Sequence, residues 1–184
     1  LHSMIYVKDI DQFIIAETYS DSIIFLSGND FSEKKRLRWS KVGRDQHHIN
    51  SLCVYDGYLY FSAFSASGVW RLGIWNDGCI GRIPLDAKSM TDVNLVSTGL
   101  RQPHSGFVDA AQTAICESQE RTFLVGSRVR ARLYGYTRGL YIDNNILLVG
   151  YSKSRNLDRF LENNSFKNNF CSVNVFDKQN NTYK

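Results

Sequence analysis

Three short stretches of the chain follow one template, and this repetition is the strongest constraint on the fold. Residues 51–56, 104–109 and 138–143 each consist of a small or polar residue, a few mostly apolar residues and an aspartate. A fainter copy occupies residues 4–9, and the four aspartates are 47, 53 and 34 positions apart. Strand-like repeats of roughly 40–50 residues are typical of a β-propeller, in which each repeat forms one blade.

The segments between these copies also favour strands. Residues 12–27 contain two β-rich runs around a polar turn at residues 18–21, which predicts a hairpin. Asp56 and Gly57 separate two further apolar runs, and this pair accepts the positive φ angles of a type I′ turn. No stretch longer than about ten residues has the apolar spacing of a helix. We therefore predict an all-β, β-propeller-like fold with about four blade equivalents of antiparallel strands.

We expect a single domain over residues 1–184. Its blades are predicted at residues 1–46, 47–100, 101–136 and 137–184. A closed propeller typically has four to eight blades, so the chain is either a very small propeller or part of a larger one. The abrupt end of the fourth repeat at Lys184 favours the second alternative.

Composition limits the compartment and the partners. The chain has 184 residues, of which 43% are hydrophobic, enough for a globular core. No apolar run approaches the ~20 residues that span a bilayer, so we expect no membrane partner. The four cysteines are scattered without a CxxC pair, which favours buried free thiols, a reducing compartment and a cytoplasmic location. Nothing in the sequence indicates a cofactor.

The formal net charge of +4 comes mainly from two basic clusters, at residues 34–38 and 128–132. Alternation places Arg128, Arg130 and Arg132 on one face of a strand. Such a face could bind a polyanion with a steep salt dependence, or it could be the solvated face of an outer blade strand. We expect the second, and we do not expect nucleic acid as a partner.

Polar residues lie where a propeller would bring them together. The first strand of each blade lines the central channel, so residues at the start of these strands meet at one mouth. Two cations after the second strand of the fourth repeat extend the set. The residues concerned are His48, Asn50, His104, Ser105, Arg138, Lys153 and Arg155. Convergent polar groups at the mouth of a β-structure predict a ligand site.

The residue types indicate an anionic ligand. Arg138 and Arg155 carry paired N–H donors that suit a carboxylate, phosphate or sulfate, and Lys153 adds a further positive charge. His48 and His104 are candidate catalytic residues, because imidazoles transfer protons near neutral pH.

Asn50 and Ser105 could orient a ligand, and Trp70, which follows a glycine-centred turn, could form part of the wall. The structural alternative is that these polar groups tie blades together and that the tryptophan packs against a neighbouring blade.

Histidines also raise the question of a metal. His47, His48 and His104 could supply imidazoles, but adjacent strand residues point to opposite faces, so His47 and His48 are not expected to bind one ion together. No aspartate or glutamate accompanies them at ligand spacing. We therefore predict no metal.

Several short motifs occur in one order along the chain. They lie at residues 47–50, 68–71, 103–105, 136–140 and 149–155. In this order they resemble an uncharacterised, mainly bacterial family known as domain of unknown function 4915. The resemblance implies a propeller-like fold and full-length members that are considerably longer, but no particular reaction.

Two functions remain open. The first is a soluble propeller that binds, and in an enzymatic version converts, a small polar or anionic metabolite at the channel mouth. The second is a scaffold that binds a protein partner without catalysis. A ligand site requires a concave pocket with His104 and Arg138 near each other, whereas a scaffold requires these residues to be paired internally and an apolar patch elsewhere. The sequence does not decide whether the protein is an enzyme.

Overall fold

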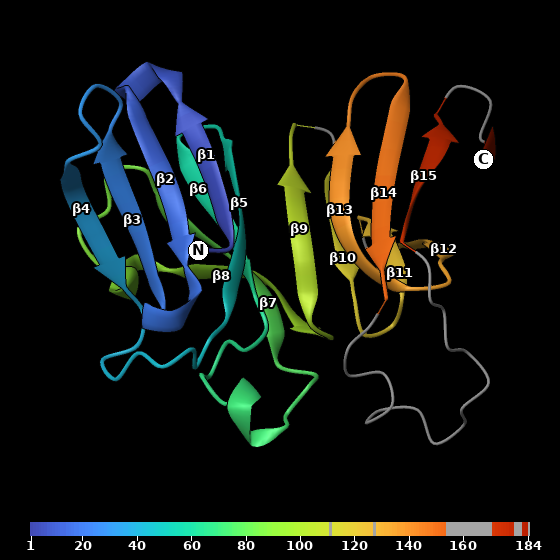
Figure 1. Ribbon diagram of the computed structural model, residues 1–184, viewed down its shortest axis with the longest axis horizontal. Coiled ribbons are helices and arrows are strands. Elements are labelled where there is room, and N and C mark those ends of the chain that lie inside the picture. The colour runs from blue at the N-terminus through green and yellow to red at the C-terminus, as the bar shows by residue number, and fades with distance from the viewer. Residues whose placement is uncertain (111, 127, 154–170, 179–181, 184) are drawn as a thin grey trace.

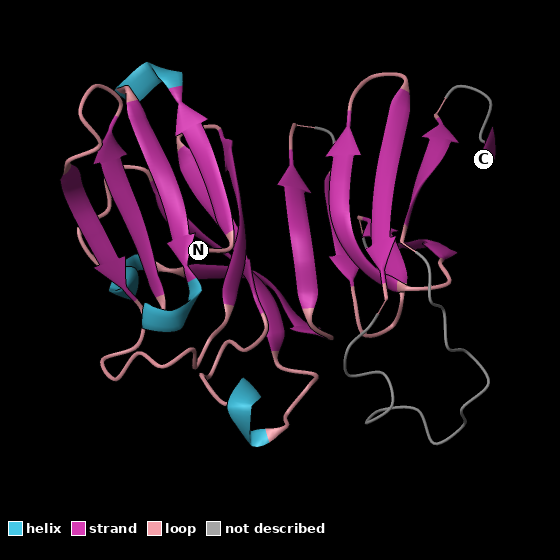
Figure 2. Ribbon diagram, viewed as in Figure 1, coloured by secondary structure: helices cyan, strands magenta, loops and turns pink. Residues whose placement is uncertain are grey.

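The computed structural model describes residues 1–110, 112–126, 128–153, 171–178 and 182–183. The described part consists of four antiparallel sheets with four strands each, which confirms the all-β prediction (Figure 1). Figure 2 shows that helix among these described residues is confined to short segments between strands. They are four single 3-10 turns, η1 (Lys8–Ile10), η2 (Thr18–Ser20), η3 (Trp70–Leu72) and η4 (Met90–Asp92). None of these described helices is long and apolar enough to cross a membrane.

The first sheet contains the predicted hairpin. Its strands, in sheet order, are β1 (Ser3–Val7), β2 (Gln12–Glu17), β3 (Ser22–Ser27) and β4 (Glu33–Arg38). The turns before β2 and β3 each end on an aspartate in the left-handed region, Asp11 with φ 48° and Asp21 with φ 51°. Aspartate tolerates this region better than most residues, so these positions close the turns locally.

The second sheet is built around the Asp-Gly turn. Its strands are β5 (Ile49–Tyr55), β6 (Tyr58–Ala63), β7 (Gly78–Pro84) and β8 (Asn94–Leu100). Asp56 and Gly57 have φ of 49° and 75°, as the type I′ prediction requires.

The third and fourth sheets repeat the same order. The third contains β9 (Pro103–Val108), β10 (Thr113–Glu117), β11 (Thr122–Val125) and β12 (Arg128–Arg132). The fourth contains β13 (Tyr136–Ile142), β14 (Ile146–Ser152), β15 (Ser172–Asp177) and β16 (Thr182–Tyr183). Arg128, Arg130 and Arg132 are exposed on β12, which forms one edge of its sheet.

The first strands of successive sheets lie next to one another. β5 contacts both β1 and β9, and β9 also contacts β13. The sheets therefore follow each other in chain order, as blades do in a propeller. The expected blade limits at residues 46/47 and 100/101 fall between sheets, and the limit at 136/137 falls at the start of β13. That the four sheets form one domain stays a prediction.

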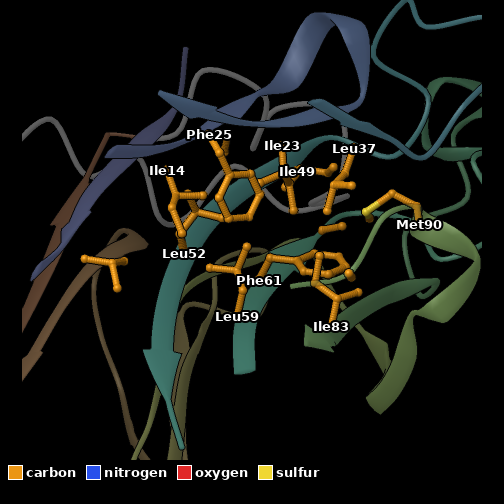
Figure 3. Close-up of a cluster of buried hydrophobic side chains, with 14 of the residues drawn as sticks. Ile14, Ile23, Phe25, Leu37, Ile49, Leu52, Leu59, Phe61, Ile83 and Met90 are labelled. Atoms are coloured by element: carbon orange, nitrogen blue, oxygen red, sulfur yellow. The ribbon is translucent and has the colours of Figure 1, made fainter. Parts of the chain in front are cut away.

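Apolar clusters between the sheets fix these neighbours. Figure 3 shows Ile14 and Phe25 of the first sheet packed against Leu59, Phe61 and Ile83 of the second, all almost completely buried. Similar clusters join the second sheet to the third and the third to the fourth. Each fully buried side chain of this size contributes about 1.5–3 kcal/mol, so packing holds the ends of the inner strands in place.

Candidate functional site

Three histidines from three sheets meet where the inner strands begin. His2 directly precedes β1, His48 directly precedes β5, and His104 is the second residue of β9. One ring nitrogen from each lies within 4.8 Å of those of the other two. The ring centroid of His2 lies 5.4 Å from that of His48 and 5.5 Å from that of His104. The structure therefore brings together the two predicted catalytic histidines and adds a third.

Hydrogen bonds determine the tautomer of His104, which is buried. Its Nδ1 lies 2.8 Å from Ser118 Oγ. Ser118 donates its hydroxyl proton to the carbonyl of Thr137, so Nδ1–H of His104 must be the donor to Ser118. Nε2 of the neutral ring then carries a lone pair. Burial, followed by the nearby charges of His2, Arg138 and His48, holds the pKa of His104 well below its usual range, which keeps this ring neutral.

His48 is oriented by a carboxylate. Its Nδ1 lies 2.7 Å from Asp45 Oδ1, and since a carboxylate only accepts, Nδ1–H donates and Nε2 is free to bind another group. The buried Asp45 also pairs with Arg71. Phe64 stacks on the His48 ring at 4.1 Å between centroids. The ring is thus held by a hydrogen bond at its edge and an aromatic contact on its face.

The loop that presents Asp45 has an unusual backbone. Gly43, Arg44 and Asp45 have consecutive φ values of 66°, 67° and 61°, and His48 has φ 56°. For residues other than glycine this region is disfavoured, by roughly 1–3 kcal/mol for each position, and such positions concentrate at functional sites. The strain accompanies the placement of the Asp45–His48 pair at the start of the inner strands.

His2 was not among the predicted site residues. It is exposed, and partial desolvation followed by the nearby charges of His48 and Arg138 lowers its pKa. The rule that selected His48, a residue directly before the first strand of a repeat, also selects His2 in the first repeat. The signal was therefore present, but the faintness of the first repeat concealed it.

Arg138 lies at the same end of the inner strands. It is exposed, and its Cζ lies 4.9 Å from the centroid of the Tyr136 ring, which in turn contacts the His104 ring at 5.5 Å between centroids. Its charge contributes to the lowered pKa of both His2 and His104. His104 and Arg138 are therefore neighbours, although 34 residues separate them.

A cavity lies along the inner strands. It has a volume of about 560 Å³ and is lined by residues of all four inner strands, including Ser3, Ser51, Ser105 and Leu140. Ser105 has φ 54° and donates its hydroxyl to the carbonyl of Arg138, which ties β9 to β13 beside the cavity. Ser3 and Ser105, which line this cavity, directly follow His2 and His104 in the chain, but the three histidines and Arg138 are not among its lining residues.

Asn50 and Trp70 have mainly internal partners. The Asn50 amide donates to the carbonyls of His48 at 3.1 Å and Pro103 at 2.9 Å, and its oxygen accepts from Ser62 Oγ at 2.7 Å. The Trp70 indole donates to the Asp45 carbonyl, with its ring centroid 4.8 Å from that of His48. Asn50 joins the second sheet to the third, and Trp70 forms part of the wall around His48.

Of the remaining candidates, Lys153 follows Ser152, which pairs with Tyr136 at the start of β13. Lys153 is exposed one residue beyond β14, and Arg155 lies outside the described residues. His47 stacks on Trp39 at 4.1 Å between centroids, and its Nδ1 lies 2.9 Å from the Ser65 carbonyl. His47 thus has different surroundings from His48, as the sequence argument expected.

Four blade-like sheets with a polar mouth at the start of the inner strands define a β-propeller-like protein. The chain belongs to the family described as Domain of unknown function (DUF4915), which matches residues 2–183. No curated protein matches it.

A chain of a solved structure with a similar fold agrees with the propeller-like architecture. A chain of a nidogen/laminin complex is 15% identical with a TM-score of 0.61, and the match covers 94% of this chain and 60% of that one. The computationally designed Ika8 protein is 9% identical with a TM-score of 0.53, and 98% of this chain matches 46% of that one. A putative gluconolactonase is 12% identical with a TM-score of 0.49, covering 83% and 72% of the two chains. The chain therefore spans about half to three fifths of the first two chains, and the likeness to these two shows the fold alone.

Proposed function

We propose that this protein binds a small polar or anionic metabolite at the channel mouth. The observation that carries the proposal is the position of the Arg138 guanidinium close to the imidazoles of His2 and His104, which cluster with His48 at one end of the inner strands. The same strands line a cavity of about 560 Å³. Guanidinium donors pair with carboxylate, phosphate and sulfate oxygens, and such charge-assisted hydrogen bonds are stronger than neutral ones.

The two predicted catalytic histidines would act on the bound ligand. Both donate Nδ1–H to fixed acceptors, Asp45 and Ser118, so each keeps its Nε2 for the ligand. A neutral imidazole nitrogen can accept a hydrogen bond or a proton from the ligand. Lys153 and Arg155 remain proposed members of the site that would add positive charge. Conversion of the ligand would follow from proton transfer at His48 or His104.

A thermal-shift screen with small carboxylates, phosphate esters and sulfates tests the proposal. A ligand that binds only the folded protein stabilises it by about 2.7 kcal/mol at a hundredfold excess over Kd. We expect an anion from the panel to raise the Tm of the wild-type protein and to have little effect on Arg138→Ala.

The matched control is Arg128→Ala, which removes an exposed arginine from β12, a different strand at the edge of its sheet. It should respond to the anion as the wild type does. The proposal fails if no anion separates Arg138→Ala from Arg128→Ala.

The alternative, a protein-interaction scaffold, is favoured by one observation. Apolar side chains are exposed on the first and last sheets, where Met4 and Tyr6 lie on one face of β1 and Val173 and Val175 on one face of β15. Exposed apolar faces of this kind suit a protein partner. This alternative predicts that the anion panel leaves wild type and Arg138→Ala equally unaffected. It also predicts that Val173→Ser with Val175→Ser weakens self-association or partner binding in sedimentation measurements.

A further inference from the structure

The three clustered histidines have the composition of a metal site. They come from three different sheets, and one nitrogen of each lies within 4.8 Å of the others. The prediction that no metal binds considered His47, His48 and His104, whereas the structure places His2 in the cluster and His47 outside it. The histidines that cluster in the structure therefore differ from the set considered from the sequence, with His2 in place of His47.

Both inner histidines have the supporting contacts that metal-ligating histidines typically have. A ligating imidazole usually donates its other N–H to a carboxylate or another fixed acceptor, which sets the tautomer and the ring orientation. His48 donates to Asp45 at 2.7 Å, and His104 donates to Ser118 at 2.8 Å. Nε2 is consequently the nitrogen that each ring can offer to an ion.

The spacing requires only a small adjustment. Nitrogens that share one tetrahedral ion at about 2.05 Å lie about 3.3 Å apart, so the three nitrogens would have to approach by up to ~1.5 Å. His104 is buried and His48 is held between Asp45 and Phe64, whereas the side chain of His2 is exposed and can turn. Rotation of the His2 ring would bring its nitrogen closer to those of His48 and His104. Any remaining separation between His48 and His104 would have to close by small shifts of these two rings.

The donor set selects the class of ion. Three imidazoles suit Zn²⁺ and neighbouring transition metals, whereas Ca²⁺ and Mg²⁺ require oxygen ligands. The carboxylate of Asp45 is engaged with His48 and Arg71 and does not belong to the cluster. Three protein ligands leave the fourth tetrahedral position open, as in catalytic zinc sites.

We propose that His2, His48 and His104 bind one divalent transition-metal ion of the zinc class at the channel mouth, with an open coordination position. Where the proposed function also holds, this open position and Arg138 would bind the same anionic ligand, and only this last step rests on the proposed function. Metal binding itself requires no anion.

The test uses the full chain without a polyhistidine tag, freed of metal by a chelator and titrated with zinc chloride in a buffer without carboxylates, phosphate or sulfate. We expect one Zn²⁺ per chain, measured by competition with a chelating dye. Cobalt chloride should give the intense visible absorption of a four-coordinate site, and magnesium chloride should not compete.

Two variants remove ligands and are expected to keep the fold. In His48→Asn the amide nitrogen replaces Nδ1–H toward Asp45 while Nε2 is lost, and His2→Gln changes an exposed side chain. Asp45→Asn should weaken zinc binding about 10–100-fold, as for other second-layer partners of metal ligands, and His48→Asn should weaken it further. The matched control, His47→Asn, preserves a donor to Ser65 and should bind zinc as the wild type does.

The inference is overturned if the chain binds no stoichiometric zinc, or if His48→Asn and His2→Gln, folded by circular dichroism, bind it like the wild type. The anion screen, run on chelator-treated protein and on zinc-loaded protein, separates the two proposals. Zinc binding without any anion effect supports the metal site and refutes the proposed function. An anion effect that depends on Arg138, in a protein that does not bind zinc, supports the proposed function and refutes the metal site.

Discussion

Nδ1 of His104 lies 2.8 Å from Ser118 Oγ, and the same hydroxyl donates to the backbone carbonyl of Thr137. One serine thus orients the imidazole and joins the third sheet to the fourth. His104 and Thr137 are both buried, so water could not take the place of the serine hydroxyl if it were removed.

Ser118→Ala should therefore destabilise the protein by about 1–3 kcal/mol, because a buried carbonyl loses this donor and the buried N–H of His104 keeps only the Gln102 carbonyl at 3.4 Å. Urea unfolding measures the change. Ser172→Ala, at an exposed serine of β15, serves as the control and should change the free energy of unfolding by less than about 0.5 kcal/mol. Equal effects of the two variants would mean that the His104–Ser118–Thr137 chain of hydrogen bonds does not form.

A close packing contact in the second sheet provides another prediction. Gly81 on β7 pairs with Phe61 on β6, and a Cβ at Gly81 would lie 2.4 Å from Phe61 Cζ. Gly81→Ala should displace this almost completely buried ring and destabilise the fold by about 1–3 kcal/mol. Urea unfolding measures the change. The double variant Phe61→Leu/Gly81→Ala should lose less stability than the sum of the losses in the two single variants.

Gly106→Ala is the matched control on β9. The nearest atom to a Cβ there is Ile115 Cδ1 at 3.8 Å, an ordinary contact, so the substitution should be neutral or slightly stabilising through the unfolded state. Strong destabilisation by this control together with a neutral Gly81→Ala would refute the packing explanation.

Much of the fold was accessible from local sequence. The hairpin at residues 12–27 and the turn at Asp56-Gly57 were predicted because their signals are short-range: β-rich runs and residues that accept positive φ. β4 and β8 were missed because they are outer strands with mainly exposed side chains, and such strands carry little apolar alternation. Their place is set by pairing with β3 and β7 instead.

The candidate site was only partly accessible from sequence. His48, His104 and Arg138 were identified because the repeat places them at equivalent points of successive blades. Asp45 and Ser118 were not identified. Asp45 contacts the His48 ring because of a strained loop, and Ser118 contacts the His104 ring from an adjacent turn, and neither arrangement can be read from the sequence. Asn50 illustrates the converse: its residue type suits ligand binding, but its amide is hydrogen-bonded within the protein, to two carbonyls and a serine. Which of these groups bind a ligand stays a prediction.

An exposed turn in the first sheet predicts a specific acid sensitivity. The backbone N–H and hydroxyl of Ser32 donate to Asp30 at 3.0 and 2.8 Å, and these bonds lower the pKa of Asp30 from 3.8 to about 2. Because the folded-state pKa lies below the unfolded value, the contribution to stability is present above pH ~4 and lost as the pH falls toward 2.

Asp30→Asn should therefore be less stable than the wild type at pH 5 to 7, and the difference should shrink between about pH 4 and pH 2. Urea unfolding across this pH range measures it. In the Ser32→Ala background, which removes the hydroxyl donor, the pH dependence should be smaller. A difference between wild type and Asp30→Asn that stays constant from pH 6 to pH 2 would contradict the assignment.

The cysteines report whether the apolar interfaces between the sheets stay closed. Cys79 and Cys116 are completely buried, in the clusters that join the first sheet to the second and the third to the fourth, and burial raises the pKa of each to about 12. Only the thiolate reacts with alkylating reagents, and at pH 8 about one in 10⁴ of such thiols is ionised. Cys171, in contrast, is exposed.

Iodoacetamide at pH 8 should therefore label Cys171 in the native protein. Cys79 and Cys116 should be labelled only after denaturation, as peptide mass spectrometry would show. Cys53, which is partly buried with its pKa raised by burial, should react at an intermediate rate. Labelling of Cys79 in native protein as fast as Cys171 would mean that the interface between the first two sheets opens. The strands β1 and β5, which follow His2 and His48, would then no longer be held side by side.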